Sequence, residues 1–81
     1  MMSREVGRED IVIGKYLKMK RVKNNLSQKD IAKYLKVTFQ QIQKYEAGIN
    51  RLSLTNAIRL SNYIDFKLEE VSNIVEYKMN D

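Results

Sequence analysis

The sequence predicts a small all-α protein with five helices, and three observations lead to this fold class. The 81 residues include no Pro and three Gly, which is typical of helices joined by short turns without a flexible linker. Within each expected helix, apolar residues recur at the three- and four-residue spacing of one helical face. Residues 27–48 hold two short helix signals in tandem, separated by only a few residues. A chain of this length forms one domain, and we find no internal repeat.

The first helix is expected to follow Asp10, which can act as its N-cap, and to run to about Lys23. Ile13, Leu17 and Arg21 recur along it at i, i+4 and i+8. This spacing puts an arginine on the apolar face, where a buried charge needs a partner.

Capping signals mark the beginnings of the second and third helices. Ser27 and Asp30 have the spacing of a capping box, with Asp in place of Glu or Gln. The second helix carries its apolar residues on one side: Ile31, Ala32 and Leu35. Thr38 can cap the third helix, and Gly48 ends it in a backbone conformation that glycine tolerates best. Two short helices with so tight a connection must cross steeply, as in a helix-turn-helix.

The third helix has two faces of different chemistry. Its inner face holds Ile42, Tyr45 and Glu46. Its outer face holds Gln40, Gln43, Lys44 and Ala47. Because the outer face is polar without being acidic, its side chains can hydrogen-bond the edges of DNA bases.

A fourth helix is expected after Ser53, which can act as its N-cap. The residues expected to face inward from it are Leu54, Ala57, Ile58, Ser61 and Ile64. A connection at residues 65–66 leads to a fifth helix from about Lys67 to Lys78. Its apolar residues are Leu68, Val71, Ile74 and Val75.

The composition favours a binding module over an enzyme. The chain is too short to enclose a deep catalytic pocket, and it contains no Cys and no His, so the commonest zinc ligands and the commonest general base are absent. We therefore expect no metal and no cofactor. Glu69, Glu70 and Glu76 could imitate a carboxylate site, but acids on an exposed helix are ordinarily solvated. Neither a signal peptide nor a transmembrane segment is recognisable, which fits a cytoplasmic protein without a membrane partner.

The charge of the chain is unevenly distributed. Residues 11–36 hold eight Lys or Arg against one acid, whereas residues 53–81 hold three basic and five acidic residues. A chain that used Lys only for solubility would spread it evenly. The distribution therefore predicts a surface for a polyanion at one end of the domain.

The order of residues in the tandem signal resembles a known family. Ser-Gln-x-x-Ile-Ala, then Leu-x-Val-Thr, then Ile-x-x-Tyr-Glu-x-Gly is similar to the lambda-repressor-like helix-turn-helix domain, often called the Xre family. The resemblance covers roughly residues 11–66 and implies a compact five-helix DNA-binding domain whose second and third helices form the motif. We accordingly divide the chain into a flexible N-terminal arm (1–10), the DNA-binding domain (11–66) and a C-terminal dimerisation helix (67–81).

Phe39, Gln40, Gln43 and Lys44 are the candidate base-contacting residues. Gln can bind adenine through two hydrogen bonds, Lys can donate to guanine, and an apolar ring can lie against a thymine methyl group. The resemblance implies base contacts by Phe39, Gln40 and Lys44. A plain solvated helix face would look the same in isolation.

Gln28, Lys29, Thr38 and Arg51 are the candidate phosphate-contacting residues. Gln28 is the first residue of the second helix, where the side chain and the helix N-terminus can be directed at a phosphate. The resemblance supports this role for Gln28. Arg51 lies in the loop after the third helix and can reach a phosphate or the minor groove. Two or three of six lysines, Lys29 among them, are expected to touch DNA: Lys15, Lys18, Lys20, Lys23, Lys29 and Lys33.

Two further features concern stability. Arg21 and Glu46 each sit on an otherwise apolar face, and the resemblance implies that they form a salt bridge, the alternative being two solvated charges. The turn between the motif helices often carries Gly in this family, whereas Lys36 stands there in this chain. A left-handed backbone at a non-glycine residue costs on the order of 1 kcal/mol.

These observations favour a transcriptional regulator, most simply a repressor, that reads the major groove of duplex DNA with residues 38–47. It would act as a homodimer on a palindromic operator and would bind no small molecule. Two alternatives stay open: an antitoxin that binds and neutralises a partner protein, and a restriction-modification controller protein.

Overall fold

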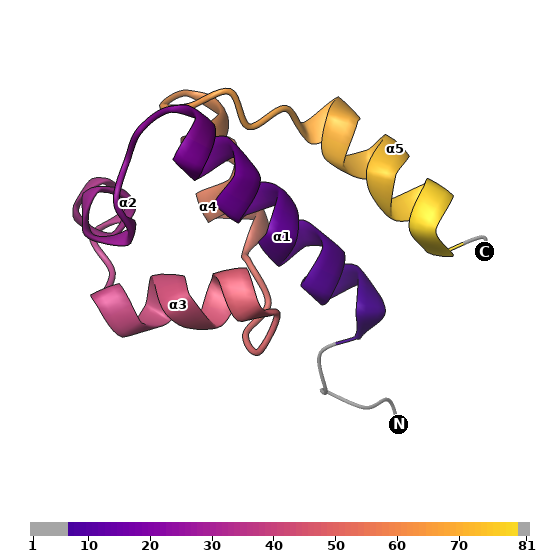
Figure 1. The fold of residues 1–81 in the computed structure, drawn as a ribbon, viewed down its shortest axis with the longest axis horizontal. Helices are drawn as coiled ribbons and strands as arrows, with labels where there is room; N and C mark the ends of the chain where they lie inside the picture. The colour runs from indigo at the N-terminus through magenta and orange to yellow at the C-terminus, as the bar shows by residue number, and fades with distance from the viewer. Residues whose placement is uncertain (1–6, 80–81) are drawn as a thin grey trace.

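The computed structural model describes residues 7–79, which form five α-helices and no strand (Figure 1). The helices are α1 (Arg8–Lys23), α2 (Gln28–Leu35), α3 (Phe39–Ala47), α4 (Leu54–Ser61) and α5 (Leu68–Met79). In the view of Figure 1, α1 runs through the middle of the molecule, with α2 and α3 to one side and α5 to the other. The all-α architecture with five helices is the one that the sequence predicts.

Local capping bonds begin three of the helices at the expected residues. The Ser27 hydroxyl accepts the Asp30 backbone N–H at 3.0 Å, and the Asp30 carboxylate accepts the Ser27 N–H at 2.8 Å. Hydrogen bonding of the Asp30 carboxylate to the Ser27 backbone N–H, and to the Ser27 side chain, holds the pKa of Asp30 below its ordinary value. The hydroxyls of Thr38 and Ser53 each accept the backbone N–H three residues further on, at 3.0 and 3.1 Å. The capping predictions for α2, α3 and α4 are confirmed.

The beginning of α1 differs from the expectation. The helix starts at Arg8 with Gly7 as its N-cap, so Asp10 is the third helical residue and not the cap. The Asp10 carboxylate instead accepts the Gly7 N–H at 2.7 Å. An Asp at either position can satisfy an N-terminal N–H, which is why the sequence leaves the start ambiguous. The expected flexible arm (1–10) therefore contains residues that are helical, and its part before Gly7 lies outside the described residues.

Left-handed backbone conformations end two of the short helices. Lys36, at the end of α2, has φ 60° and ψ 44°, and the next N–H, that of Val37, donates to the Ala32 carbonyl at 3.0 Å. Gly48 ends α3 with φ 74°. Lys36 thus occupies the strained turn that the sequence predicts, in a region that glycine adopts more readily.

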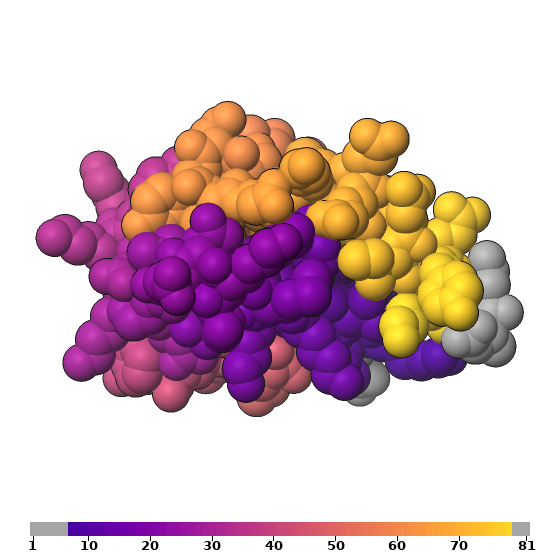
Figure 2. Space-filling view, turned by 45° about the horizontal axis from the view of Figure 1, so that its top comes forward, coloured from indigo at the N-terminus to yellow at the C-terminus, as the bar shows by residue number. Residues whose placement is uncertain are grey.

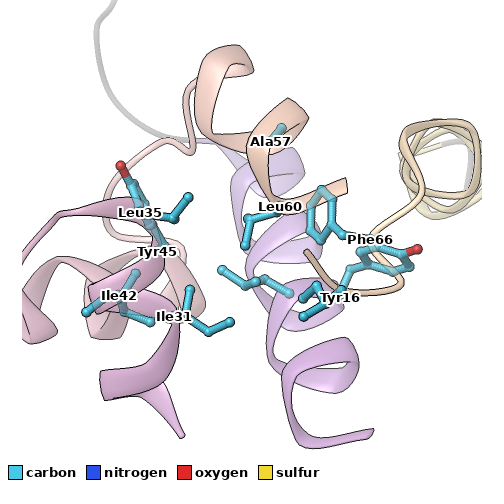
Figure 3. Packing of buried hydrophobic residues seen from close by; sticks show 11 residues of the cluster. Tyr16, Ile31, Leu35, Ile42, Tyr45, Ala57, Leu60 and Phe66 are labelled. Carbon is cyan, nitrogen blue, oxygen red and sulfur yellow. The ribbon is translucent and has the colours of Figure 1, made fainter. Parts of the chain in front are cut away.

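The core lies where α1, α2, α3 and α4 meet, and the connection between α4 and α5 closes it (Figure 3). Its largest fully buried side chains are Leu17, Ile31, Leu35, Ile42, Leu60 and Phe66. Tyr16 of α1 packs against Phe66 edge to face, with the ring centroids 5.1 Å apart and the planes at 71°. The core is small: each of the helices α1 to α4 contributes two or three buried side chains, and α5 only packs partly buried Val71 and Ile74 against it.

The inward face of α4 agrees only in part with the expectation. Ala57 and, just after the helix, Ile64 are buried as expected, and Leu60 is buried as well. Leu54 and Ile58 are instead 71% and 44% exposed. The apolar arc of this helix is too wide for so small a core, which buries only one half of it. Ser61 is also exposed, as is Leu68 at the start of α5. The exposed half of the arc is available for another contact.

A single arginine of α4 forms hydrogen bonds with the carbonyl groups at the end of α2. The Arg59 guanidinium donates to the carbonyls of Tyr34 and Leu35 at 2.8 and 3.0 Å, and the Tyr34 hydroxyl donates to the Arg59 carbonyl at 2.8 Å. The last carbonyls of a helix have no partner within it, so this arginine serves as a cap supplied by another helix.

A polar cluster attaches α5 to α1. Lys20 is buried, and its Nζ atom lies 3.3 Å from a carboxylate oxygen of Asp65 and 3.3 Å from one of Glu70. The Tyr16 hydroxyl donates to Glu70 and accepts the Lys67 backbone N–H at 3.1 Å. Lys20 is therefore not a surface lysine near DNA, as the sequence allowed, because its ammonium group is held between two acids.

Candidate nucleic-acid interface

The outer face of α3 presents polar side chains to solvent. Gln40, Gln43 and Lys44 are exposed, together with Ala47. Phe39, at the first position of the helix, is half-buried, and the Lys29 ammonium of α2 lies 5.7 Å from the centroid of its ring. The four expected base-contacting residues and Lys29 thus belong to one continuous surface of α2 and α3.

Close backbone contact fixes α3 against α1. A Cβ atom at Gly14 of α1 would lie 2.3 Å from the carbonyl oxygen of Tyr45 and 2.8 Å from that of Glu46, so only glycine allows this approach. At the end of α3, a Cβ atom at Gly48 would lie 2.7 Å from the Ile11 Cα. The two glycines let the backbones of α1 and α3 meet, which gives α3 a rigid support.

The structure brings Arg21 and Glu46 together beneath α3. The Arg21 Nε and Nη2 atoms donate to the two carboxylate oxygens of Glu46 at 2.6 and 3.1 Å. The Arg21 Nη1 atom donates to the Leu26 carbonyl at 2.9 Å. The side chains of Arg21 and Glu46 are only 11% and 4% exposed. The pair therefore holds α1, α3 and the turn before α2 in one arrangement.

Two of the expected phosphate-contacting side chains form hydrogen bonds within the domain. The Gln28 Nε2 atom donates to a carboxylate oxygen of Glu46 at 2.9 Å. The Arg51 guanidinium lies 3.3 Å from the carboxylate of Asp10, and the Arg51 side chain is 56% exposed. Gln28 is the first residue of α2, so its backbone N–H is one of the donors that a helix N-terminus directs outward.

The other two expected phosphate-contacting residues, Lys29 and Thr38, are exposed. Lys29 follows Gln28 in the first turn of α2. The Thr38 hydroxyl accepts the Gln41 backbone N–H, which leaves its own hydrogen able to donate. All four candidates border the N-termini of α2 and α3 or the loop that follows α3.

Sequence reasoning missed the partners of Asp10 and Gln28. Asp10 and Arg51 are 41 positions apart, and Gln28 and Glu46 are 18 apart. No local pattern marks such pairs, because both partners are ordinary polar residues in their own segments. Of these four residues, only Glu46 lies on an otherwise apolar helix face, which indicated from the sequence that it needs a partner.

A family model described as Helix-turn-helix matches residues 17–71. The chain belongs to the helix-turn-helix family. This family is not enzymatic, as the composition predicts. The matched segment contains α2 and α3 whole, so the resemblance to lambda-repressor-like domains is confirmed.

Curated relatives of this helix-turn-helix protein include an uncharacterized HTH-type transcriptional regulator of Sinorhizobium medicae, which is 36% identical over 69% of this chain and 40% of its own length. Another, from Rickettsia conorii, is 35% identical over 74% of this chain and 48% of its own length. The chain thus spans less than half the length of these relatives.

Among solved structures, the helix-turn-helix protein is similar to the restriction-modification controller protein C.AhdI from Aeromonas hydrophila. The TM-score is 0.71 at 23% sequence identity, and the match covers 80% of this chain and 98% of the other. The likeness establishes the shared all-α fold.

Two further findings concern the described part of the chain. None of its helices is both long and apolar enough to cross a membrane. Residues 7–79 also contain no group of three acidic, Cys or His side chains placed to hold a metal ion.

Proposed function

We propose that this helix-turn-helix protein is a transcriptional regulator that binds duplex DNA sequence-specifically, with α3 in the major groove. The observation that carries the proposal is the exposed, non-acidic outer face of α3 on a helix whose inner side is fixed by Gly14, Gly48 and the Arg21–Glu46 pair. A fixed helix can present side chains to base edges in one register.

Gln40 and Lys44 are the residues that we propose to read bases. They are four positions apart, so they lie one turn apart on the same face and can both reach base edges when α3 lies in the groove. Gln43 and Phe39 flank them. A glutamine can hydrogen-bond adenine and a lysine can donate to guanine, which makes this face able to distinguish base pairs.

Lys29, Thr38, Gln28 and Arg51 are the residues that we propose to position the DNA backbone. Contacts with phosphates fix the register of a protein on the duplex without carrying sequence information. The N-terminus of α2 adds backbone donors and the positive end of the helix dipole.

We infer that the protein acts as a homodimer on a palindromic operator, through α4 and α5. Exposed Leu54 and Ile58 lie on α4, and a shallow hollow of about 500 Å³ runs along α5. Its apolar lining consists of Ile13, Leu68, Val71 and Val75. These surfaces exceed what the small core of one chain can bury, which favours a second copy as their cover. A dimer that occupies an operator represses by excluding the polymerase, so repression needs no further domain.

Selection of bound sequences from random duplex DNA tests this function, because it yields an inverted repeat if the proposal is right. On the selected site, Gln40→Ala and Lys44→Ala should each cost about 1 to 3 kcal/mol, with little loss on random DNA. Equal losses on specific and random duplexes would show that α3 does not read sequence.

Lys29→Ala supplies the matching test of a phosphate contact. It should weaken binding to specific and random duplexes alike. The plot of the logarithm of the association constant against the logarithm of the salt concentration should become less steep by about one unit. Lys78→Ala removes the same charge from the end of α5 and should leave the slope unchanged. Gln28→Ala and Arg51→Ala should also act on both kinds of duplex, but their bonds to Glu46 and Asp10 require a parallel measurement of stability.

A further inference from the structure

A groove separates α1 from α5 on the surface of the molecule. It has a volume of about 260 Å³. Its lining is Ile11, Val12, Lys15, Tyr16, Met19, Ile74 and Lys78. Figure 2 presents the face on which α1 and α5 lie side by side. Apolar and aromatic side chains make up most of the lining of this α1–α5 groove and are called its apolar floor, and the charged side chains of the lining are Lys15 and Lys78.

The apolar floor continues along α1 beyond the groove. Met19 and Val22 are 51% and 55% exposed, and a second hollow joins them to three lysines. That hollow is lined by Lys15, Lys18, Met19, Val22 and Lys23. Ile11, Lys15, Met19 and Val22 follow one another at i, i+4, i+8 and i+11, so they form one stripe of α1 that is roughly 16 Å long and has Lys15 in its middle. Met19 and Val22 are its most exposed apolar side chains in the described part of the chain.

Among residues 7–79, the charges that line the stripe have a single sign. Neither hollow has an acidic residue from this part of the chain in its lining. The nearby acids are directed elsewhere: Glu70 binds Tyr16 and Lys20, Asp10 binds Arg51, and Glu9 and Glu76 line the hollow on the other side of α5. An apolar floor with a purely basic rim is complementary to an apolar stripe with an acidic rim.

We propose that the α1–α5 groove binds an acidic amphipathic helix of a partner protein. Apolar side chains at helical spacing would enter the groove and cover Met19 and Val22, as in other complexes of a helix in a groove. Glutamates or aspartates beside them would pair with Lys15, Lys18 and Lys78. This placement buries the exposed stripe and supplies the missing negative charge together.

Charge and shape argue against the other occupants. A two-fold dimer across this groove would bring each lysine rim against its own copy, which is repulsive. A flat lipid surface cannot fill a hollow between two helices. DNA would satisfy the lysines but would leave the apolar floor without a contact.

The groove is separate from the outer face of α3. The side of α1 that packs along α3 carries Gly14 and Arg21, whereas Met19 and Val22 are exposed to solvent. Only Ile11, at one end of the groove, lies close to α3, at Gly48 just after its last residue. The partner could therefore bind while α3 is on DNA. The inference does not depend on the proposed function, because it rests on α1 and α5 alone.

NMR titration of the full chain with a designed peptide tests the proposal. The probe is a helical peptide of about 18 residues, with Leu at i, i+3 and i+7 and Glu beside them, and a matched peptide carries Lys in place of Glu. The acidic peptide should shift the signals of Met19, Val22 and Ile74, and the basic peptide should not. Equal binding of both peptides, no binding of the acidic one at millimolar concentration, or shifts confined to α3 would overturn the proposal.

Variants with reversed charges in the groove provide a second test of the proposal. Lys15→Glu with Lys18→Glu should weaken binding of the acidic peptide about tenfold or more. Lys33→Glu with Lys44→Glu makes the same change in net charge away from the groove and should have no comparable effect. The groove variant should keep wild-type self-association. A loss of self-association, or binding to phosphatidylserine vesicles that Met19→Asp abolishes, would assign the groove to a second copy or a membrane and overturn the proposal.

Discussion

At the scale of single residues, the Arg21–Glu46 pair shows why a charge can stand on an apolar helix face. Removing two charges from water is costly, and their attraction repays the cost only with good geometry and with the remaining donors satisfied. Both conditions hold, because Arg21 donates twice to Glu46 and once to the Leu26 carbonyl, and Gln28 donates to the same carboxylate.

Glu46→Ala should lower the free energy of unfolding by about 3 kcal/mol or more, because it leaves Arg21 buried without its partner. Urea denaturation of the variant measures this. Arg21→Met with Glu46→Leu replaces the pair by apolar side chains and should recover most of the loss. Additive effects of the two single changes in the double-mutant cycle would mean that the pair contributes no coupling energy.

Lys36→Gly should stabilise the fold by about 1 kcal/mol, because φ 60° is strained for lysine but not for glycine. The gain outweighs the extra freedom that glycine gives to the unfolded chain. Asn25 has nearly the same φ, 58°, and serves as the control. Since asparagine tolerates this conformation, Asn25→Gly should change stability less. Destabilisation by Lys36→Gly would show that the turn is not strained.

At the scale of the helices, sequence reasoning succeeded where the determinants are local. The Ser27–Asp30 capping box, the caps at Thr38 and Ser53, and the left-handed turn at Lys36 involve residues within a few positions of each other. Periodicity placed α2 and α3 correctly for the same reason.

Sequence reasoning failed where a choice depends on the rest of the molecule. The apolar arc of α4 permits either half to face inward, and only the packed core decides that Leu60 is buried and Ile58 exposed. Lys20 reads as a surface lysine until Asp65, 45 positions away, is brought beside it. Asp10 and Arg51 are separated in the same way.

The attachment of α5 to α1 should depend on pH. Hydrogen bonds from Lys20 hold the pKa of Asp65 below its ordinary value, and bonds from Tyr16 and Lys20 do the same for Glu70. Carboxylates with a lowered pKa stabilise the folded arrangement above their unfolded pKa of about 4 and lose this effect as the pH falls through their folded pKa. Burial alone would lower the pKa of Lys20, but its bonds to Asp65 and Glu70 raise it, so its contribution is lost only at high pH.

We therefore expect α5 to stay attached from roughly pH 5 to pH 10 and to loosen in more acidic solution. The methyl signal of Ile74 in α5 should move toward its unfolded position on acidification before that of Ile42 in α3 does. Asp65→Asn with Glu70→Gln should remove most of this pH dependence. One transition shared by α3 and α5 in the wild-type chain would mean that the cluster does not control α5 separately.

At the scale of the whole molecule, three surfaces of different chemistry surround one small core. The outer face of α3 is polar, the α1–α5 groove is mostly apolar with lysines in its lining, and the apolar hollow between α1 and α5 that Val71 and Val75 line has acids in its lining. A chain with so small a core exposes more apolar area than its own packing can cover. Exposed apolar surface of this kind marks contacts with other molecules. The charges beside the surfaces differ, which indicates a different partner for each surface.

The proposed homodimer should depend on the exposed apolar side chains of α4. Leu54→Asp with Ile58→Asp should give a monomer in sedimentation velocity experiments, because two charges would be placed in the apolar contact. The fold should survive, since both side chains are exposed and an acid in the first turn is favoured by the dipole of α4.

On DNA, the dimer should place two α3 helices about 34 Å apart, which is one helical turn of the duplex. Changing the spacing of the half-sites by about half a turn should then weaken wild-type binding strongly and leave the monomeric variant unaffected. Met19→Asp puts one such charge on an exposed residue of α1 and should leave the dimer intact. A wild-type complex that stays monomeric at saturating DNA, or a variant that dimerises as well as the wild type, would rule out α4 and α5 as the dimer interface.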